Sequence, residues 1–460
     1  MVGCPKKGAR RRQADGQLQP WHFHSGTFMN FITINLIGLA VMFVILALGM
    51  PIGFALGVVG LVGSIALIGS EPAFSMLGQT AYETVVTHEL SVVPLFILMG
   101  YFATSSGLSE ALFRACNTWL GHRRGGLALA TIGGCGGFAA ICGSSLATAA
   151  TMTQVALPEM RRYGYDERLA TGAIAAGGTI GILIPPSVIL VLYGILTETS
   201  IAELFAAGII PGVLTVVGFM LTILIVTGIN PELGPRGPKT TIVEKLRALW
   251  SVLLTLVLFL LVIGGIYTGA FTPTEAAGIG AVGAFGLAVV AGRMTPTVLL
   301  SCLTQTVKTT AMIFTILIGA FMLNKFLTLG GLAGALGEFV VDLKLSNHLT
   351  IIVILLIYFV LGCALDALAM ILLTIPIFFP IVSAVGFDAV WFGVVVVMVV
   401  EMGLISPPVG MNVFIIKGMA PDVSLGNIYR GVIPFVITQF ILIALLVAFP
   451  AIATWLPSTM

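Results

Sequence analysis

The chain has 460 residues, of which 58% are hydrophobic and only 9% charged, and its formal net charge is +2. A soluble fold of this size could not bury so much apolar surface, so the composition excludes an ordinary soluble domain. Apolar runs of spanning length recur along the chain, which predicts an all-α polytopic membrane protein whose solvent is the lipid bilayer. The sequence contains no nucleotide-binding loop and no basic block that suggests nucleic acid, so a transport cycle would draw on an ion gradient.

Residues 1–28 differ from everything that follows. They carry a cluster of basic residues and have no apolar core before Met29. No apolar segment precedes a cleavage site, so they are not a signal peptide. We interpret them as a basic extension without defined structure, either a cytoplasmic tail or sequence upstream of a natural start at Met29.

Hydropathy and helix breakers divide the remainder into two halves, 29–228 and 248–460. A polar, proline-containing linker at 229–247 separates them, and we expect it to lie in the cytoplasm. Predicted spans and helices cover about 31–48, 52–69, 91–106, 108–121, 204–228, 249–268, 274–292, 309–329 and 432–455.

A pattern of prolines, glycines and an aspartate occurs twice. Six residues recur at an offset of 222 positions and a seventh is an aromatic exchange. Pro158, Gly164, Asp166, Gly181, Pro185 and Pro186 recur as Pro380, Gly386, Asp388, Gly403, Pro407 and Pro408, and Tyr165 is replaced by Phe387. Each copy ends in a double proline inside an apolar run, which predicts broken helices at 167–197 and 389–416. Asp166 and Asp388 are expected to cap these helices at their N-termini.

The segment 127–157 is too long for one span, since about 20 residues suffice to cross a bilayer. Basic loops flank it on both sides, so both of its ends should be cytoplasmic. We therefore predict a re-entrant helical hairpin with its tip near Gly143–Ser145. Its repeat partner, 349–379, would enter from outside, with its tip near Gly362–Asp366. Together these features predict an inverted repeat with two re-entrant hairpins and two broken helices.

Double prolines remove backbone donors, and carbonyl groups left without partners in a membrane are costly. Such oxygens suit Na⁺, so each hairpin tip and the facing break is a candidate sodium site. The half-helices that follow the prolines begin with positive dipole ends, which attract an anionic substrate. The sodium candidates are Gly143, Ser144, Ser145, Gly181, Ile184 and Pro185 in the first half, and Gly362, Ala364, Asp366, Gly403, Ser406 and Pro407 in the second. The substrate candidates are Ser145, Pro186, Pro408 and Asn412.

Each candidate also has a purely structural interpretation. The prolines could be kinks, and Ser144 and Ser145 could be small packing residues. Asp366 and Glu401 are acidic residues at membrane depth, where a carboxylate indicates function by default. Glu401, which replaces Thr179 of the first half, could instead cap or orient backbone.

Several long motifs resemble the large membrane subunit of the tripartite ATP-independent periplasmic (TRAP) transporters. They are VPLFILMG at 93–100, GGTIGILIPPS at 177–187, SIAELFAAGIIPG at 200–212 and EMGLISPPVGMNVF at 401–414. The resemblance runs from about Met29 to the C-terminus. It implies a sodium-driven elevator transporter in the bacterial inner membrane, with Na⁺ as coupling ion and no other cofactor.

The resemblance also implies partners and a cargo. The partners would be a small four-helix membrane subunit and a periplasmic substrate-binding protein, and the cargo a small organic anion, mostly a carboxylate or dicarboxylate. An alternative is a stand-alone sodium/anion symporter of related inverted-repeat fold. We do not expect an enzyme, because only Asp366 and Glu401 offer acid or base groups at membrane depth and they occupy non-equivalent repeat positions.

Overall fold

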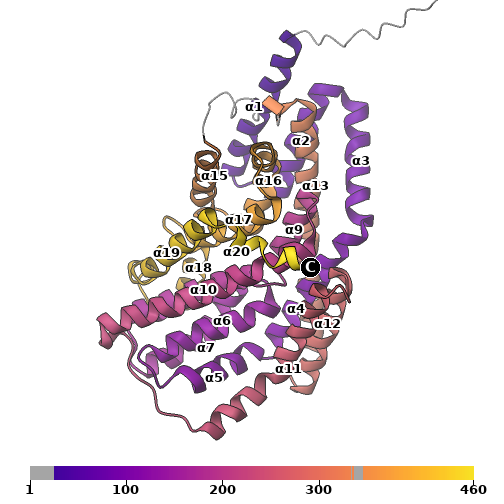
Figure 1. Cartoon of the computed structure of the whole chain (residues 1–460). Helices are drawn as coiled ribbons and strands as arrows, with labels where there is room; N and C mark the ends of the chain where they lie inside the picture. The colour runs from indigo at the N-terminus through magenta and orange to yellow at the C-terminus, as the bar shows by residue number, and fades with distance from the viewer. Residues whose placement is uncertain (1–24, 333, 336–345) are drawn as a thin grey trace, which may run out of the picture.

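A computed structural model describes residues 25–332, 334–335 and 346–460 (Figure 1). Within these ranges every regular element is a helix, which confirms the predicted all-α class. The predicted extension at 1–28 lies outside the described residues except for its last four, which begin α1.

The helices outside the repeated hairpins and breaks include the longest of the described helices. They are α1 (Ser25–Ala47), α2 (Ile52–Ile68), α3 (Ser70–Val86), α4 (Val92–Ser105), α5 (Leu108–Leu120), α10 (Ile201–Ile229), α11 (Ile242–Tyr267), α12 (Pro273–Val290), α13 (Pro296–Leu329), α19 (Leu425–Ala448) and the short α20 (Ala451–Thr454). Six described helices are long and apolar enough to cross a membrane, or up to eight if each of two bent pairs is one span.

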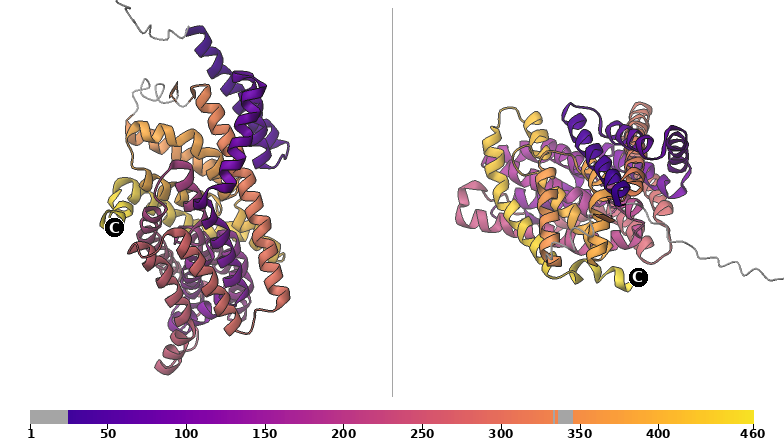
Figure 2. Two further views of the ribbon diagram at one scale, coloured as in Figure 1. Left: turned by 90° about the vertical axis from the view of Figure 1, so that its right-hand side faces the viewer. Right: turned by 90° about the horizontal axis from the view of Figure 1, so that it is seen from above.

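The helix α13 begins well before the predicted span at 309–329. Thr295 caps it, with its side chain accepting a hydrogen bond from Val298 N at 3.3 Å, and Pro296 occupies the first helical position. The helix packs closely on α2, where a Cβ added to Gly60 would lie only 2.6 Å from the backbone of Met322. Figure 2 shows α13 extending along much of the length of the molecule.

The predicted first hairpin is two antiparallel helices, α6 (Gly126–Cys142) and α7 (Ser145–Arg162). Their outer ends meet, because Leu127 N donates a 3.0 Å hydrogen bond to the hydroxyl of Tyr165, just beyond α7. The same hydroxyl donates to the carbonyl of Pro235 at 2.9 Å. The turn between the helices therefore lies at Gly143–Ser144, far from both roots.

The second hairpin is built in the same way from α15 (Asn347–Gly362) and α16 (Ala367–Val385). Here Asn347 Nδ2 donates to the carbonyl of Val385 at 3.1 Å and brings the two outer ends together. In both hairpins a hydrogen bond thus joins the outer ends, and the connecting turn lies at the opposite end. Their re-entrant path through a membrane stays a prediction.

Both predicted broken helices are interrupted at their double prolines. The first consists of α8 (Glu167–Leu183) and α9 (Val188–Thr197), bent by 42°, and the second of α17 (Ala389–Gly403) and α18 (Met411–Met419). The peptide bond within each double proline is cis. Asp166 and Asp388 accept hydrogen bonds from Arg168 N (2.8 Å) and Trp391 N (2.7 Å), which confirms both as N-caps.

Candidate functional site

The turns of the two hairpins line one cavity of about 200 Å³. Residues 142–147 reach it from the first hairpin and residues 366–368 from the second. Helices α4 and α13 close another side, where the hydroxyls of Tyr101 and Thr309 lie 3.0 Å apart. The remaining lining residues are Ile97, Gly100, Thr104, Ile182, Val188, Ile189, Ile313 and Leu404. Segments from both halves therefore enclose a single space.

Three helix N-termini open onto this cavity, those of α7, α9 and α16. The first two residues of α9, Val188 and Ile189, line it. Ser144 caps α7, with its Oγ accepting from Ala147 N at 3.4 Å. Asp366 caps α16, with Oδ1 accepting from Leu368 N and Ala369 N, both at 3.1 Å. N-termini carry partial positive charge and suit an anion. However, the lining includes the carboxyl group of Asp366 and no Lys or Arg. An anion in this cavity would therefore need cations beside it.

The first-half sodium candidates are brought together. A Cβ added to Gly181 would lie 2.8 Å from the carbonyl oxygen of Ser144, and one added to Gly143 would lie 2.8 Å from that of Pro186. The hairpin turn therefore contacts both sides of the break in α8–α9. Pro185 and Pro186 have no N–H to donate to the carbonyls one helical turn before them. Ile184 lies in this break as the C-cap of α8.

The second-half candidates are also adjacent. A Cβ added to Gly403 would lie 2.5 Å from the backbone of Gly362, and Gly410 N donates to the carbonyl of Cys363 at 3.1 Å. The carbonyls before the prolines differ from our expectation. Those of Gly403 and Leu404 accept hydrogen bonds from the backbone N–H groups of residues 406 and 412, both at 3.0 Å. The longer break at 404–410 lets the chain turn back and supply these donors.

Several candidates lie away from the cavity. Pro186, Pro408 and Asn412 are not among its lining residues, whereas Ser145 is. The first double proline is buried, but Pro407 and Pro408 are exposed, as is Ala364. The hydroxyl of Ser406 donates to the carbonyl of Met402 at 2.7 Å, within its own helix end. The substrate candidates after the prolines thus belong to the surroundings of the cavity.

Residues of the cavity wall on α4 and α13 were missed by sequence reasoning. Tyr101 follows directly after the motif at 93–100. Its hydroxyl near the end of an apolar span is a signal that could have identified it as a candidate site residue. Thr309 carried no such signal, because isolated threonines within membrane helices commonly bond to their own backbone.

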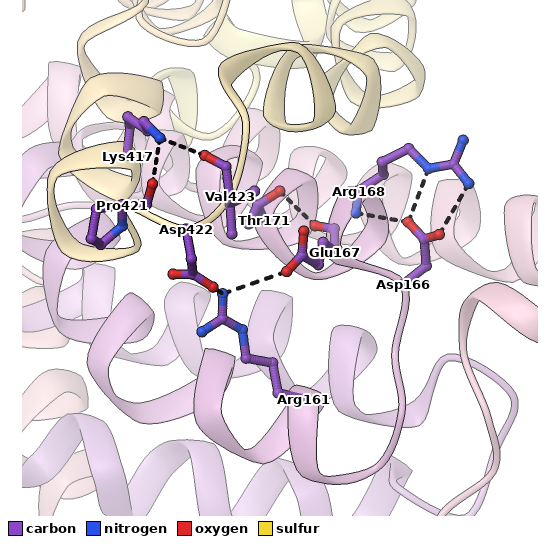
Figure 3. A network of polar contacts seen from close by, with 9 residues as sticks. All are labelled: Arg161, Asp166, Glu167, Arg168, Thr171, Lys417, Pro421, Asp422 and Val423. Atoms are coloured by element: carbon purple, nitrogen blue, oxygen red, sulfur yellow. Dashed lines mark hydrogen bonds and ion pairs between the residues drawn. The ribbon is translucent and has the colours of Figure 1, made fainter.

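A polar network ties the two halves together at the root of the first hairpin (Figure 3). Arg161, at the end of α7, pairs with Asp422 in the segment between α18 and α19, and lies 3.6 Å from Glu167. Beside it, the hydrogen bond from the Arg168 guanidinium holds the pKa of the half-buried Asp166 carboxyl below its ordinary value. This network lies at the opposite end of α7 from the cavity, about 25 Å away by helix length.

The sequence matches the family described as "Tripartite ATP-independent periplasmic transporter, DctM component" over residues 39–452. The chain belongs to this family. It is therefore a component of an inner-membrane transporter and not an enzyme.

Similar proteins include the C4-dicarboxylate TRAP transporter large permease protein DctM of Pseudomonas aeruginosa, 34% identical over 87% of this chain and 93% of that protein. The sialic acid TRAP transporter large permease protein SiaM of Vibrio cholerae is 32% identical over 89% of this chain and 95% of SiaM. Among solved structures, the Alcanivorax borkumensis YdaH transporter matches with a TM-score of 0.61 at 14% identity, covering 94% of this chain and 98% of that one. This likeness concerns the fold.

Proposed function

We propose that this large TRAP permease subunit imports a small organic anion in symport with Na⁺ by an elevator mechanism. The anion is a carboxylate or dicarboxylate, in keeping with the C4-dicarboxylate and sialic acid carriers among its relatives. A periplasmic binding protein delivers it, and a small four-helix membrane subunit completes the transporter.

The observation that carries this proposal is the charge balance of the cavity. Its lining offers three helix N-termini, several hydroxyl groups and one carboxyl group, with no basic side chain. Each helix N-terminus contributes about half a positive charge. These partial charges alone cannot balance the negative charges of Asp366 and a bound dicarboxylate. Bound cations supply the missing charge, which makes anion binding depend on Na⁺.

The residues at each hairpin turn are suited to Na⁺. They present backbone carbonyls and the hydroxyl of Ser144, which are the hard oxygen ligands that this cation prefers. In the first half, the prolines leave carbonyls of α8 without helical donors. In the second half, the carbonyls of Gly403 and Leu404 already accept one hydrogen bond, but each oxygen has a second lone pair for a cation.

The elevator step assigns different roles to the two groups of helices. The two hairpins, whose turns line the cavity, and the two broken helices would move together as one transport domain. Helices such as α2 and α13, joined by close backbone contact at Gly60, would form the stationary scaffold. The boundary passes through the cavity, between its hairpin turns and the wall formed by Tyr101 and Thr309.

Reconstitution tests this proposal. The subunit, its small partner and the binding protein are placed in proteoliposomes, and uptake of a labelled dicarboxylate or of sialic acid is followed with an inward Na⁺ or K⁺ gradient. We expect uptake only with Na⁺ and only with the binding protein. Na⁺-driven uptake without the binding protein would instead identify a stand-alone symporter. Uptake that is equal in the two gradients would contradict sodium coupling.

A further inference from the structure

Glu401 is a buried carboxylate with an incomplete set of partners. It lies near the end of α17 and is 1% exposed. Its Oε2 accepts a 2.7 Å hydrogen bond from Ser145 Oγ, which belongs to the hairpin of the other half. Its Oε1 has no hydrogen-bond partner, and none of the ion pairs among the described residues involves it. A buried charge with one neutral hydrogen bond needs a positive partner.

A second buried acceptor lies in the same region. Asn412, at the start of α18, is fully buried; its Nδ2 donates to the carbonyl of Ala175 at 3.4 Å, while its Oδ1 has no partner. A Cβ added to Gly178 would lie 3.0 Å from Asn412 Nδ2 and 3.3 Å from the carbonyl oxygen of Ser145. Asn412 and Ser145 therefore both lie against α8 at Gly178. Acceptors outnumber donors here, which is the pattern of a cation site.

Other charged and titratable groups on the helices around α17 contact different parts of the fold. Near the start of α17, Tyr193 bonds to the carbonyl of Ala389, Tyr358 contacts Phe392, and His348 contacts Phe387. Glu401 lies about 18 Å further along the helix from Ala389. Tyr429 bonds to the carbonyls of residues 408 and 409, and Asp366 caps α16. The others stand at or near helix ends. They are Asp388 at the start of α17, Cys363 at the end of α15, Glu198 at the end of α9, Glu167 and Arg168 at the start of α8, Glu203 in the first turn of α10, and Arg430 on α19. None is shown in contact with the Glu401 carboxylate.

We infer that Glu401 forms a third cation site, which takes one monovalent cation, Na⁺ or a proton. The inference rests on the proposed function, but the site differs from the two turn sites because its carboxylate lies on the broken helix α17 and not at a hairpin turn. One carboxylate neutralises one positive charge, and the described residues hold no group of three His, Cys, Asp or Glu side chains that could hold a metal ion. Because Ser145 joins the site from the first half and Glu401 from the second, occupancy would link the two halves.

The test compares Glu401→Gln with the wild-type chain in the complete transporter. The glutamine amide oxygen still accepts from Ser145, so only the charge is removed. The first measurement is Na⁺-dependent thermal stabilisation of the purified transporter at two fixed pH values. The second is the charge moved per substrate, from the reversal potential in proteoliposomes, with interior pH followed by a dye. Glu203→Gln, at an exposed position, is the matched control.

If Na⁺ occupies the site, Glu401→Gln weakens Na⁺ stabilisation about tenfold or more and moves one positive charge fewer per substrate. If a proton occupies it, Na⁺ stabilisation is unchanged and the proton movement that accompanies wild-type uptake is lost. Wild-type values for stabilisation, charge and proton movement in Glu401→Gln would overturn the inference while leaving the proposed function intact. Should Glu401→Gln fail to insert, the same measurements are made on Glu401→Asp, whose shorter side chain withdraws the carboxylate from Ser145. Weaker Na⁺ stabilisation or a loss of charge or proton movement would then support the inference, and wild-type values of all three would overturn it. Absence of any Na⁺ dependence in the wild type would instead contradict the proposed function.

Discussion

Ser144 and Asp366 occupy equivalent positions of the two halves, and each is the N-cap of the second helix of its hairpin. Both line the same cavity. The duplicated halves therefore kept the cap and changed its charge. A neutral hydroxyl faces the cavity from one side and a carboxyl group from the other, so the two ion sites should differ in affinity.

We expect Asp366→Asn to separate capping from charge. Asparagine caps helices about as well as aspartate, so membrane insertion and thermal stability should stay near wild-type values. Removing the charge should weaken Na⁺ activation of uptake about tenfold or more. An interaction with a charged group contributes about 1.5–3 kcal/mol, and about 1.4 kcal/mol corresponds to a factor of ten in affinity. Ser144→Ala should have a smaller effect, because backbone oxygens remain. Unchanged Na⁺ activation in Asp366→Asn would show that the carboxyl group serves the helix only.

We expect Gly181→Ala to disturb the first hairpin. The new Cβ would lie 2.8 Å from the carbonyl oxygen of Ser144, a backbone atom that cannot swing aside. Forcing the turn away should cost about 1–3 kcal/mol and lower uptake more than expression. Gly278→Ala is the control, because no atom lies within 4 Å of its added Cβ. Thermal melting and uptake are measured for both, and equal behaviour would rule out the close contact.

We expect the two double prolines to respond differently to substitution. Pro185→Ala restores an N–H that can bond to the carbonyl of Gly181 and close the first break. Pro407→Ala should act less strongly, because the carbonyl of Gly403 already accepts from Ser406 N at 3.0 Å. Both should weaken Na⁺ activation at near-normal expression, and the double variant should lower the Hill coefficient for Na⁺ or abolish uptake. If neither changes sodium dependence, the breaks are kinks without an ion role.

Cysteine labelling tests the path of the first hairpin. In a background without the six native cysteines, Arg124→Cys and Arg161→Cys should both react with a membrane-impermeant reagent from the cytoplasmic side. Their neighbours Leu127 and Tyr165 share a hydrogen bond, so the two positions belong to one end of the hairpin. Reaction from opposite sides of the membrane would disprove re-entry.

Local rules explain why much of this fold was predictable. A double proline removes hydrogen bonds of the adjacent helical turn, and an aspartate N-cap accepts hydrogen bonds from the next three residues. The starts of α8 and α17 and the breaks that follow them can therefore be predicted from sequence. The partners of Glu401 and Asn412 do not, because Ser145 and Ala175 lie more than 230 residues away. The donors to the carbonyls of Gly403 and Leu404 depend on how the chain returns after Pro408, which propensity does not determine.

The exchange of Tyr165 for Phe387 between the two copies of the repeat has a visible outcome. The hydroxyl of Tyr165 joins Leu127 to Pro235, whereas Phe387, which has no hydroxyl, stacks on Trp391 with ring centroids 5.2 Å apart. The hydroxyl of Tyr165 is therefore one of several groups that bind the connector at 229–247 to the first half. Gly125 N donates to the carbonyl of Gly234 at 2.9 Å, and Gly237 N donates to the carbonyl of Gly121 at 2.9 Å. When the first hairpin shifts, the start of the connector must shift with it or these hydrogen bonds must break. The attachment continues past Pro235, because the hydroxyl of Thr240 donates to the carbonyl of Thr118 at 2.6 Å.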